Sequence, residues 1–181
     1  MQEKTQSDVS PLAMKIEISD ERPADVAAIR AVTISAFLNA PHTSHTEQFI
    51  VDALREAGQL TVSLVATVDG TVVGHVAISP VSISDGATGW HGLGPISVAP
   101  EYQRRGIGSR LMREALRVLR ERGASGCVLL GEPEYYCRFG FAVVPHLKLP
   151  GVPSEYFQAL AFGSPIPRGT VSYHAAFNAS V

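Results

Sequence analysis

The stretch VAPEYQRRGIGSRLM, from Val98 to Met112, decides how the rest of this sequence is interpreted. A glutamine, two arginines and the triplet Gly106-Ile107-Gly108 stand directly before apolar residues that repeat at helical spacing. The first amides of a helix have no helical acceptor, and they carry the positive end of the helix dipole. Arginines there oppose the dipole, while glycines let the main chain approach a bulky group. We therefore expect this turn to bind an anion such as a diphosphate.

The composition is that of an ordinary globular domain. The chain has 181 residues, of which 45% are apolar and 18% charged, so it can bury a core without disulfides. Its net charge is -2, so the chain lacks the excess of basic residues that binding to nucleic acid requires. No apolar run approaches the roughly 18 residues of a membrane span. We therefore expect neither nucleic acid nor a membrane as a partner.

Cysteine usage and the first residues indicate the setting and the domain boundary. Cys127 and Cys137 are too few for a disulfide framework, which indicates a reducing, cytoplasmic location. The polar start of the chain contains no apolar segment of the kind that signal peptides carry. Patterned sequence begins directly after Met14. We expect a flexible N-terminal tail over residues 1–14 and a single domain over residues 15–181.

Alternating apolar residues predict the strands. Residues 15–19 form a first strand, and residues 60–83 read as two strands joined by Asp69-Gly70, a strong signal for a type I′ hairpin. Further strands are expected around residues 96–98, 127–133, 156–162 and 171–175. The fold class that these elements predict is α/β (α+β), with a mixed, mostly antiparallel central sheet flanked by helices.

Helical spacing predicts three helices. The first follows a cap at Ser19 or Asp20, and the second follows a capping box that runs from Ser44 to Glu47. The third opens at the glycine turn and ends at Gly123. Its buried face is expected to consist of Ile107, Leu111, Ala115 and Leu119.

The glycine turn can be compared with three phosphate-binding patterns. A Walker A loop needs Gly-Lys-Ser/Thr, which the chain lacks. A dinucleotide fingerprint needs a third small residue, but this chain has Leu111 at that position. The fingerprint also needs a βαβ unit, whereas a hairpin precedes the turn here. The third pattern, Gln/Arg-x-x-Gly-x-Gly/Ala after a strand, fits from Gln103 to Gly108 at every position.

This third pattern resembles the GNAT superfamily of acetyl-CoA-dependent N-acetyltransferases. The segments GPISVAP, EYQRRGIGSRLM, ERGASG, CVLLG and YYCRFGF occur in the order usual for that superfamily and span roughly residues 92–144. The preceding helices and hairpin match its layout as well. The combination of GPISV, GEPEYY and PRGTVSYHAAF is similar to a bacterial subgroup of predicted acetyltransferases. The resemblance implies that two strands of the sheet splay apart to form a slot for an acyl-CoA.

The resemblance also implies how acetyl-CoA would bind. The main-chain amides from Arg104 to Ser109 would hold its pyrophosphate, and its pantetheine arm would pair with the preceding strand. An N–H near Val98 would stabilise the oxyanion. The cofactor-binding residues implied in this way are Ile96, Ser97, Val98, Gln103, Arg104, Arg105, Gly106, Ile107, Gly108 and Ser109.

Two catalytic roles follow from the resemblance. The motif Tyr-x-x-x-Gly-Phe begins at Tyr136, which is the expected acid for the departing thiolate, although Tyr135 competes for the role and both rings could simply pack. Glu132, at the end of a strand beside the slot, is the expected base. His75 and His91 are alternatives for that base.

The expected function is transfer of an acetyl group from acetyl-CoA to a primary amine of a small molecule or protein by direct attack. The alternative is a catalytically idle acyl-CoA sensor or interaction module. The acceptor groove is expected between residues 39–44, the hairpin end near Pro80 and residues 164–169, and a homodimer could form through the C-terminal strands.

Two other chemistries are not expected. His42 and His45 are three residues apart, but no second ligand pair follows them, so we predict no metal site. Cys137 has no histidine paired with it in the sequence, and direct attack needs no covalent nucleophile. Trp90 is expected to pack or to line the acceptor groove.

Overall fold

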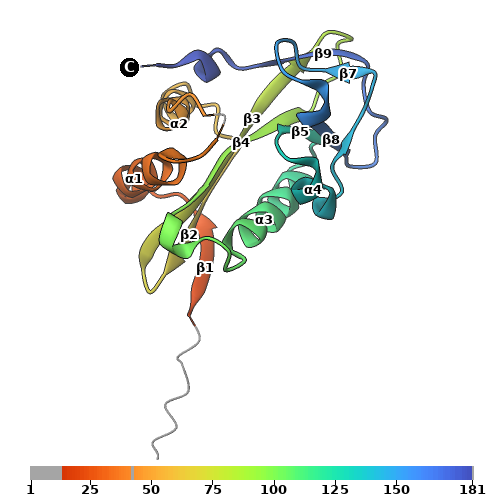
Figure 1. The fold of residues 1–181 in the computed structure, drawn as a ribbon. Helices are drawn as coiled ribbons and strands as arrows, with labels where there is room; N and C mark the ends of the chain where they lie inside the picture. Colours follow the sequence, from red (N-terminus) through yellow and green to blue (C-terminus); the bar gives the residue numbers. More distant parts are fainter. Residues whose placement is uncertain (1–13, 42, 181) are drawn as a thin grey trace, which may run out of the picture.

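The described part of the chain, residues 14–41 and 43–180 of a computed structural model, forms a sheet with helices on both faces (Figure 1). Residues 1–13, almost all of the predicted tail, lie outside it. The helices are α1 (Val26–Phe37), α2 (Glu47–Glu56), α3 (Ile107–Glu121) and α4 (Pro133–Tyr136). The strands are β1 (Ile16–Asp20), β2 (Val62–Val68), β3 (Thr71–Ile83), β4 (Trp90–Val98), β5 (Gly126–Leu130), β6 (Ala142–Val143), β7 (Leu147–Lys148), β8 (Phe157–Ala161) and β9 (Gly169–Tyr173).

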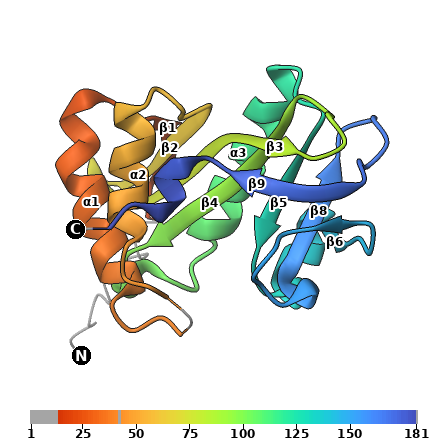
Figure 2. The same cartoon turned by 90° about the horizontal axis from the view of Figure 1, so that it is seen from above.

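The sheet is mixed and mostly antiparallel, as predicted. Its main path runs β1-β2-β3-β4-β5-β8-β6, and β9 pairs with the far end of β3 and with β7. The β4–β5 and β7–β9 pairs are parallel, and the other pairs are antiparallel. Figures 1 and 2 show α1 and α2 on one face of the sheet and α3 on the other. The sequence did not reveal the short strands β6 and β7.

The largest core lies between α3 and the sheet. The predicted face of α3 is confirmed, and Met112 and Leu116 extend it. Leu111 and Leu119 are completely buried, against a layer from β2 and β3 that includes Val76 and Ile78. Burying one such side chain contributes about 1.5–3 kcal/mol. This packing holds the first turn of α3 against the sheet and therefore fixes where the glycine turn lies.

The hairpin between β2 and β3 has the predicted turn. Asp69 and Gly70 have φ angles of 49° and 80°, the left-handed values that a type I′ turn requires. The two strands pair from Val62↔Ile78 to Val68↔Thr71, with one bulge between Ala66 and Thr67. The long strand β3 then continues beyond β2 and carries β9 at its far end.

The first helix begins later than predicted. Asp20 pairs with Leu64 in the sheet, which keeps it extended and unable to cap a helix. A 3₁₀ turn, Pro23–Asp25, precedes α1 instead. The carboxylate of Asp25 accepts the backbone N–H of Arg22 at 2.8 Å. The cap prediction was therefore wrong by one turn.

The second helix also starts differently. It begins at Glu47, so the predicted capping box from Ser44 to Glu47 is wrong. His45 has a φ of 58°, which turns the chain before the helix. As a result Ser44 Oγ lies 2.7 Å from Thr46 Oγ1 rather than capping a helical amide.

Candidate functional site: a slot beside the glycine turn

The two central parallel strands separate at one end. β4 and β5 pair only where Trp90, His91 and Gly92 face Gly126, Cys127 and Val128. Beyond these pairs β4 continues to Val98 and β5 to Leu130 without being hydrogen-bonded to each other. Because β3 covers only one edge of β4, the other edge of β4 faces a slot. The splayed pair implied by the family resemblance is present.

The edge of β4 offers main-chain donors to this slot. The N–H of Ala99 donates to Val73 O at 2.8 Å, which places it on the β3 side. Successive peptide groups of a strand point in opposite directions, so the N–H groups of Val98 and Ile96 point away from β3. Gln103 Nε2 donates to Val98 O at 3.0 Å and ties the glycine turn to the end of β4.

The glycine turn presents the start of α3 to the same slot. Gly106 occupies the N-cap with a φ of 79° and has no side chain to satisfy the first amides. The first turn closes with the N–H of Arg110 donating to Gly106 O at 3.1 Å. The N–H groups of Ile107, Gly108 and Ser109 therefore have no acceptor within the helix. Such a terminus suits an anion.

A cavity of about 530 Å³ lies at this turn, and we call it the turn cavity. Nine of the ten predicted cofactor residues line it, namely Ile96, Ser97, Val98, Gln103, Arg104, Gly106, Ile107, Gly108 and Ser109. Arg105 does not, because its guanidinium lies over the ring of Tyr102, 5.6 Å from the ring centroid. The prediction for Arg105 concerned its main-chain amide and stays a prediction, while its side chain points away from the cavity.

Four further residues line the turn cavity. Tyr135 and Tyr136 are the two candidates for the acid, whereas Tyr102 and Arg138 had no role assigned from the sequence. The Arg138 guanidinium lies 4.5 Å from the centroid of the Tyr135 ring, which positions a cation at the cavity wall. No local signal marks Arg138, because α4 and the following 3₁₀ turn bring it to α3 only in the tertiary structure.

The adjacent tyrosines point to different places. The hydroxyl of Tyr135 lies 3.5 Å from Ser109 Oγ, at the turn cavity. Tyr136 is mostly buried, and its ring packs edge-on against Phe141 with centroids 6.4 Å apart. Adjacent helical residues point about 100° apart, which explains the division. Burial raises the pKa of the Tyr136 hydroxyl to about 12, and Tyr135 adds to the shift.

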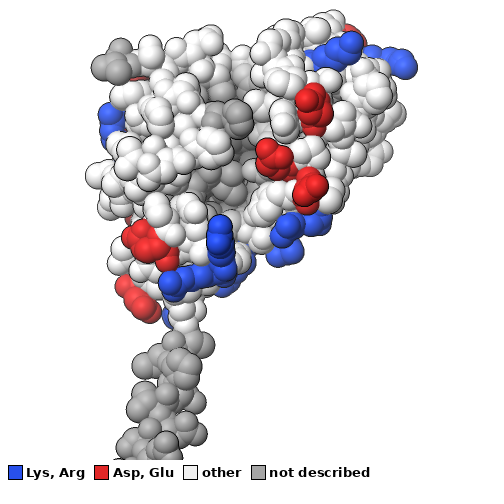
Figure 3. All heavy atoms as spheres, viewed as in Figure 1, with Lys and Arg blue, Asp and Glu red and all other residues white. Residues whose placement is uncertain are grey.

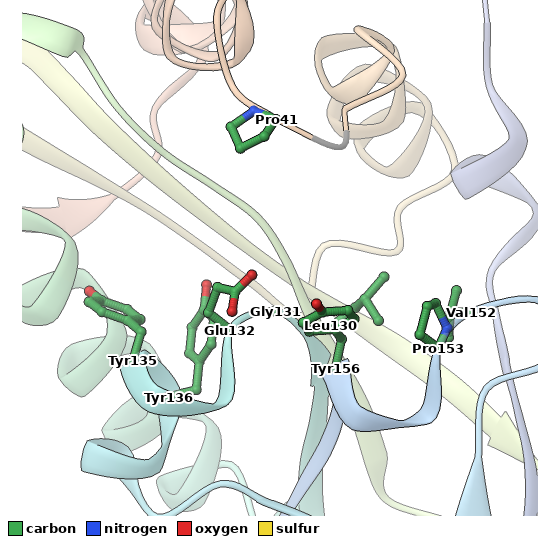
Figure 4. A pocket seen from close by; sticks show the side chains of 9 residues that line it. All are labelled: Pro41, Leu130, Gly131, Glu132, Tyr135, Tyr136, Val152, Pro153 and Tyr156. Atoms are coloured by element: carbon green, nitrogen blue, oxygen red, sulfur yellow. The ribbon is translucent and has the colours of Figure 1, made fainter.

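A second cavity, the outer cavity, opens between α4 and the connection from α1 to α2 (Figure 4). It has a volume of about 590 Å³. Pro41 forms one side, and Leu130, Gly131, Glu132, Tyr135, Tyr136, Val152, Pro153 and Tyr156 form the other. Glu132 is exposed here, at the N-cap of α4.

A third cavity, the inner cavity, has a volume of about 490 Å³ and lies between β4, the end of β5 and the start of α2. It shares Ile96 and Tyr136 with the turn cavity, and it shares Leu130, Tyr136 and Val152 with the outer cavity. Tyr136 therefore lines all three cavities. It stands where a molecule in the slot would meet one in either of the other two.

The two histidines considered as bases lie elsewhere. His75 is buried among α1, α2 and the sheet, with Nε2 2.8 Å from Ser63 Oγ and 3.6 Å from Glu21 Oε2. Burial lowers the pKa of His75, despite the opposing effect of Glu21. His91 is half-buried, with Nδ1 3.2 Å from Gly89 O, and burial lowers its pKa. Neither lines any of the three cavities.

The walls predicted for the acceptor groove are only partly right. Pro41, within residues 39–44, lines the outer cavity, but His42 lies outside the described residues. Pro80 and residues 164–169 line neither the outer nor the inner cavity. Residues 149–156 take their place, because β8 pairs with β5 and brings the preceding loop to the slot. Trp90 is buried in a core beneath Gly126 and does not line the groove.

The described residues contain no cluster suited to a metal. No group of three or more His, Cys, Asp or Glu side chains comes together in residues 14–41 and 43–180. Cys137 is exposed and lines none of the three cavities. Over the same residues, every helix is too short or too polar to cross a membrane.

Charge is unevenly distributed around the site. Figure 3 shows a hollow in the middle of one face, with mostly uncharged walls. Acidic side chains follow one side of the hollow, and basic side chains gather below it, in the region where Figure 1 places the start of α3. The positive region lies where an anion would be expected from the exposed amides.

Comparisons with known proteins point to one family. A model of the acetyltransferase (GNAT) family matches residues 26–141. The chain is 39% identical over 158 residues to the uncharacterized N-acetyltransferase YhbS of Escherichia coli K12, covering 83% of this chain and 94% of that protein. The residues matched by the family model include the hairpin, the slot, the glycine turn and both tyrosines.

Solved structures extend the comparison to ligands. A GNAT family acetyltransferase from Brucella melitensis, crystallised with acetyl-CoA, has 52% identity and a TM-score of 0.81, over 90% of this chain and 98% of that one. Escherichia coli YhbS in complex with CoA has 35% identity and a TM-score of 0.82, over 94% of this chain and 96% of that one.

The fold, the splayed strands and these matches define an acetyltransferase. The chain belongs to the GNAT family. The resemblance drawn from GPISVAP, the glycine turn and YYCRFGF is thereby confirmed.

Proposed function

We propose that this protein transfers the acetyl group of acetyl-CoA to a primary amine by direct attack. The observation that carries the proposal is the meeting of three cavities at Tyr136, with the slot and the glycine turn on one side and two acceptor-sized cavities on the other. The relatives crystallised with acetyl-CoA and CoA support the choice of donor.

The turn cavity fits the diphosphate of this donor. It combines the amides of Ile107, Gly108 and Ser109, which lack helical acceptors, with the side chains of Arg104 and Arg138. A Cβ on Gly108 would point to within 3.3 Å of the Tyr135 hydroxyl, so the glycine keeps this wall open. Arg104 has a φ of 60°, a left-handed conformation that few non-glycine residues adopt.

The edge of β4 would hold the rest of the donor. The exposed main-chain groups of Ile96 and Val98 can pair with an extended amide-bearing arm as a further strand would, with Ser97 between them. The N–H of Val98, which points into the slot, would donate to the oxygen of the acetyl carbonyl. Preorganised donors of this kind stabilise a developing oxyanion.

Tyr136 is assigned as the acid. The reaction breaks a C–S bond and forms a C–N bond, so the sulfur gains one proton and the amine loses one. A hydroxyl with a pKa of about 12 keeps its proton across the physiological range and can donate it to a thiolate. Tyr135 lines the turn and outer cavities but not the inner one, and its hydroxyl lies 3.5 Å from Ser109 Oγ at the glycine turn. Glu132 remains the proposed base, at the mouth of the outer cavity.

The test combines binding and turnover. Calorimetry should show that acetyl-CoA binds, and a panel of primary amines should release free CoA in its presence. Tyr136→Phe should lower kcat by about 10²- to 10⁴-fold, the usual contribution of a positioned acid, while the Kd for acetyl-CoA stays the same. Binding without turnover of any amine, and no effect of Tyr136→Phe, would instead identify an acyl-CoA sensor.

A further inference from the structure

The inner cavity is lined by apolar and tyrosine side chains and by one carboxylate, that of Glu47. We propose that the acceptor is a small primary amine on an apolar body with no second charge, and that Glu47 binds its nitrogen. The inference rests on the proposed function, because it names the acceptor class of the same site. In the sequence, Glu47 stands out only as part of a predicted helix cap.

The lining of the inner cavity defines the body of the acceptor. Apart from Glu47, all of its lining residues are Gly, Pro, Leu, Ile, Val, Phe or Tyr. The Tyr173 hydroxyl in this wall stays neutral, because burial raises its pKa. A volume of about 490 Å³ suits a small molecule. A second charge on the acceptor would be buried here without a partner, which is costly.

Glu47 has a free acceptor site. Its Oε1 accepts a hydrogen bond from the Thr43 hydroxyl. Its Oε2 is buried, and within the described part of the chain it makes no hydrogen bond. A buried carboxylate oxygen left in this state is unfavourable until a donor reaches it. An amine or ammonium group supplies such donors.

The position of Glu47 suits this role. As the first residue of α2, it shares the inner cavity with Gly94, Pro95 and Ile96 of β4 and with Tyr136. Ile96 and Tyr136 also line the turn cavity. A nitrogen held in the inner cavity therefore lies on the side of β4 that faces the slot, from which it can approach a thioester bound there. Glu132, the proposed base, lines the outer cavity, which adjoins the inner cavity at Leu130, Tyr136 and Val152.

The first experiment compares amines that differ in one property. With acetyl-CoA as donor, kcat/KM is measured by CoA release for 2-phenylethylamine and 3-methylbutylamine. Putrescine adds a second cation, phenylalanine adds a carboxylate, and ethanolamine removes the apolar body. We expect the two apolar amines to exceed the other three by at least about 10²-fold, because each misfit leaves a buried charge or an empty apolar cavity.

The second experiment isolates Glu47. Glu47→Gln should raise the KM for 2-phenylethylamine by about 10- to 100-fold, the size of a lost charged hydrogen bond, without changing the Kd for acetyl-CoA. Glu56→Gln, at the exposed other end of the same helix, is the matched control and should behave like the wild type. Thermal melts of both variants confirm folding.

The outcomes separate this inference from the proposed function. If putrescine, phenylalanine or ethanolamine is the better substrate, or Glu47→Gln leaves KM unchanged, the inference is overturned and the acetyltransferase function stands. If no amine reacts, the proposed function fails, and calorimetry of 2-phenylethylamine against the CoA complex decides the inference. Equal affinity of wild type and Glu47→Gln would then refute it, and weaker binding by the variant would support it.

Discussion

Gly131 keeps Tyr136 in place, so a single methyl group there should slow the reaction without touching the cofactor. A Cβ at Gly131 would lie 2.3 Å from Cε2 of Tyr136 and 2.9 Å from Cδ2. Ordinary contacts begin at 3.4 Å, so 3.4 minus 2.3 leaves 1.1 Å by which the ring must move. Gly131 does not have a positive φ, so alanine strains the ring rather than the backbone.

The size of the effect follows from this displacement. Moving a reacting group by about 1 Å costs on the order of 10²-fold in rate, or about 2.7 kcal/mol of activation free energy. We therefore expect Gly131→Ala to lower kcat by about 10²-fold. The Kd for acetyl-CoA should change far less than kcat, because the substitution leaves the glycine turn intact and displaces only Tyr136 among the residues of the turn cavity. Overpacking should also destabilise the fold by about 1–3 kcal/mol.

The assay is steady-state CoA release at 25 °C with the best amine of the panel, together with a thermal melt. Gly126→Ala is the matched control, because its Cβ would meet the Trp90 ring at 2.4 Å, at the other end of β5. The melting temperature of Gly126→Ala should fall at least as far as that of Gly131→Ala, by about 2–4 °C for each kcal/mol of lost stability. Its kcat should stay at the wild-type value.

Two results would refute the reasoning. One is a wild-type kcat for Gly131→Ala, and the other is an equal loss of kcat in Gly126→Ala, which would assign the effect to stability. In a Tyr136→Phe background, Gly131→Ala should add little further loss of rate, since both changes act on the same hydroxyl.

Two further predictions concern the turn and the sheet. Gly108→Ala should weaken acetyl-CoA binding about 10-fold or more, because the added Cβ narrows the turn cavity. The same change should raise the free energy of unfolding by about 0.5–1 kcal/mol, because Gly108 lies within a helix at an ordinary φ. Calorimetry should show the weaker binding, and denaturant unfolding should show the higher stability. Although burial raises the pKa of Glu21, the nearby His75 and the hydrogen bonds from Arg55 and Ser63 outweigh it and lower that pKa well below its usual value of 4.5. The stability this carboxylate contributes is then full above the unfolded-state pKa of 4.5 and is lost as the pH falls toward the lower folded-state pKa. Glu21→Gln should therefore cost about 2 kcal/mol at pH 7, discounted for partial exposure, and progressively less below pH 4.5; a pH-independent difference would contradict this assignment.

Much of the fold could be predicted because the deciding interactions are local. The hairpin at Asp69-Gly70 depends on two φ angles, and the buried face of α3 depends on residue spacing within one helix. The glycine turn is likewise a local feature, since its unsatisfied amides come from the start of a helix. Nine of the ten residues assigned to the donor line one cavity for this reason, and the side chain of Arg105 turns toward Tyr102 because a side chain's direction depends on its neighbours.

The acceptor side was decided only by the tertiary structure. Residues 149–156 reach the slot because β8 pairs with β5, and Arg138 reaches the turn cavity because α4 packs beside α3. Nothing local distinguishes Glu47 from the other carboxylates of the chain. Its Oε2 is set apart by burial against residues from distant segments, which no spacing in the sequence encodes. Local chemistry could therefore predict where the donor binds, while the surroundings of the acceptor depend on which distant segments pack together.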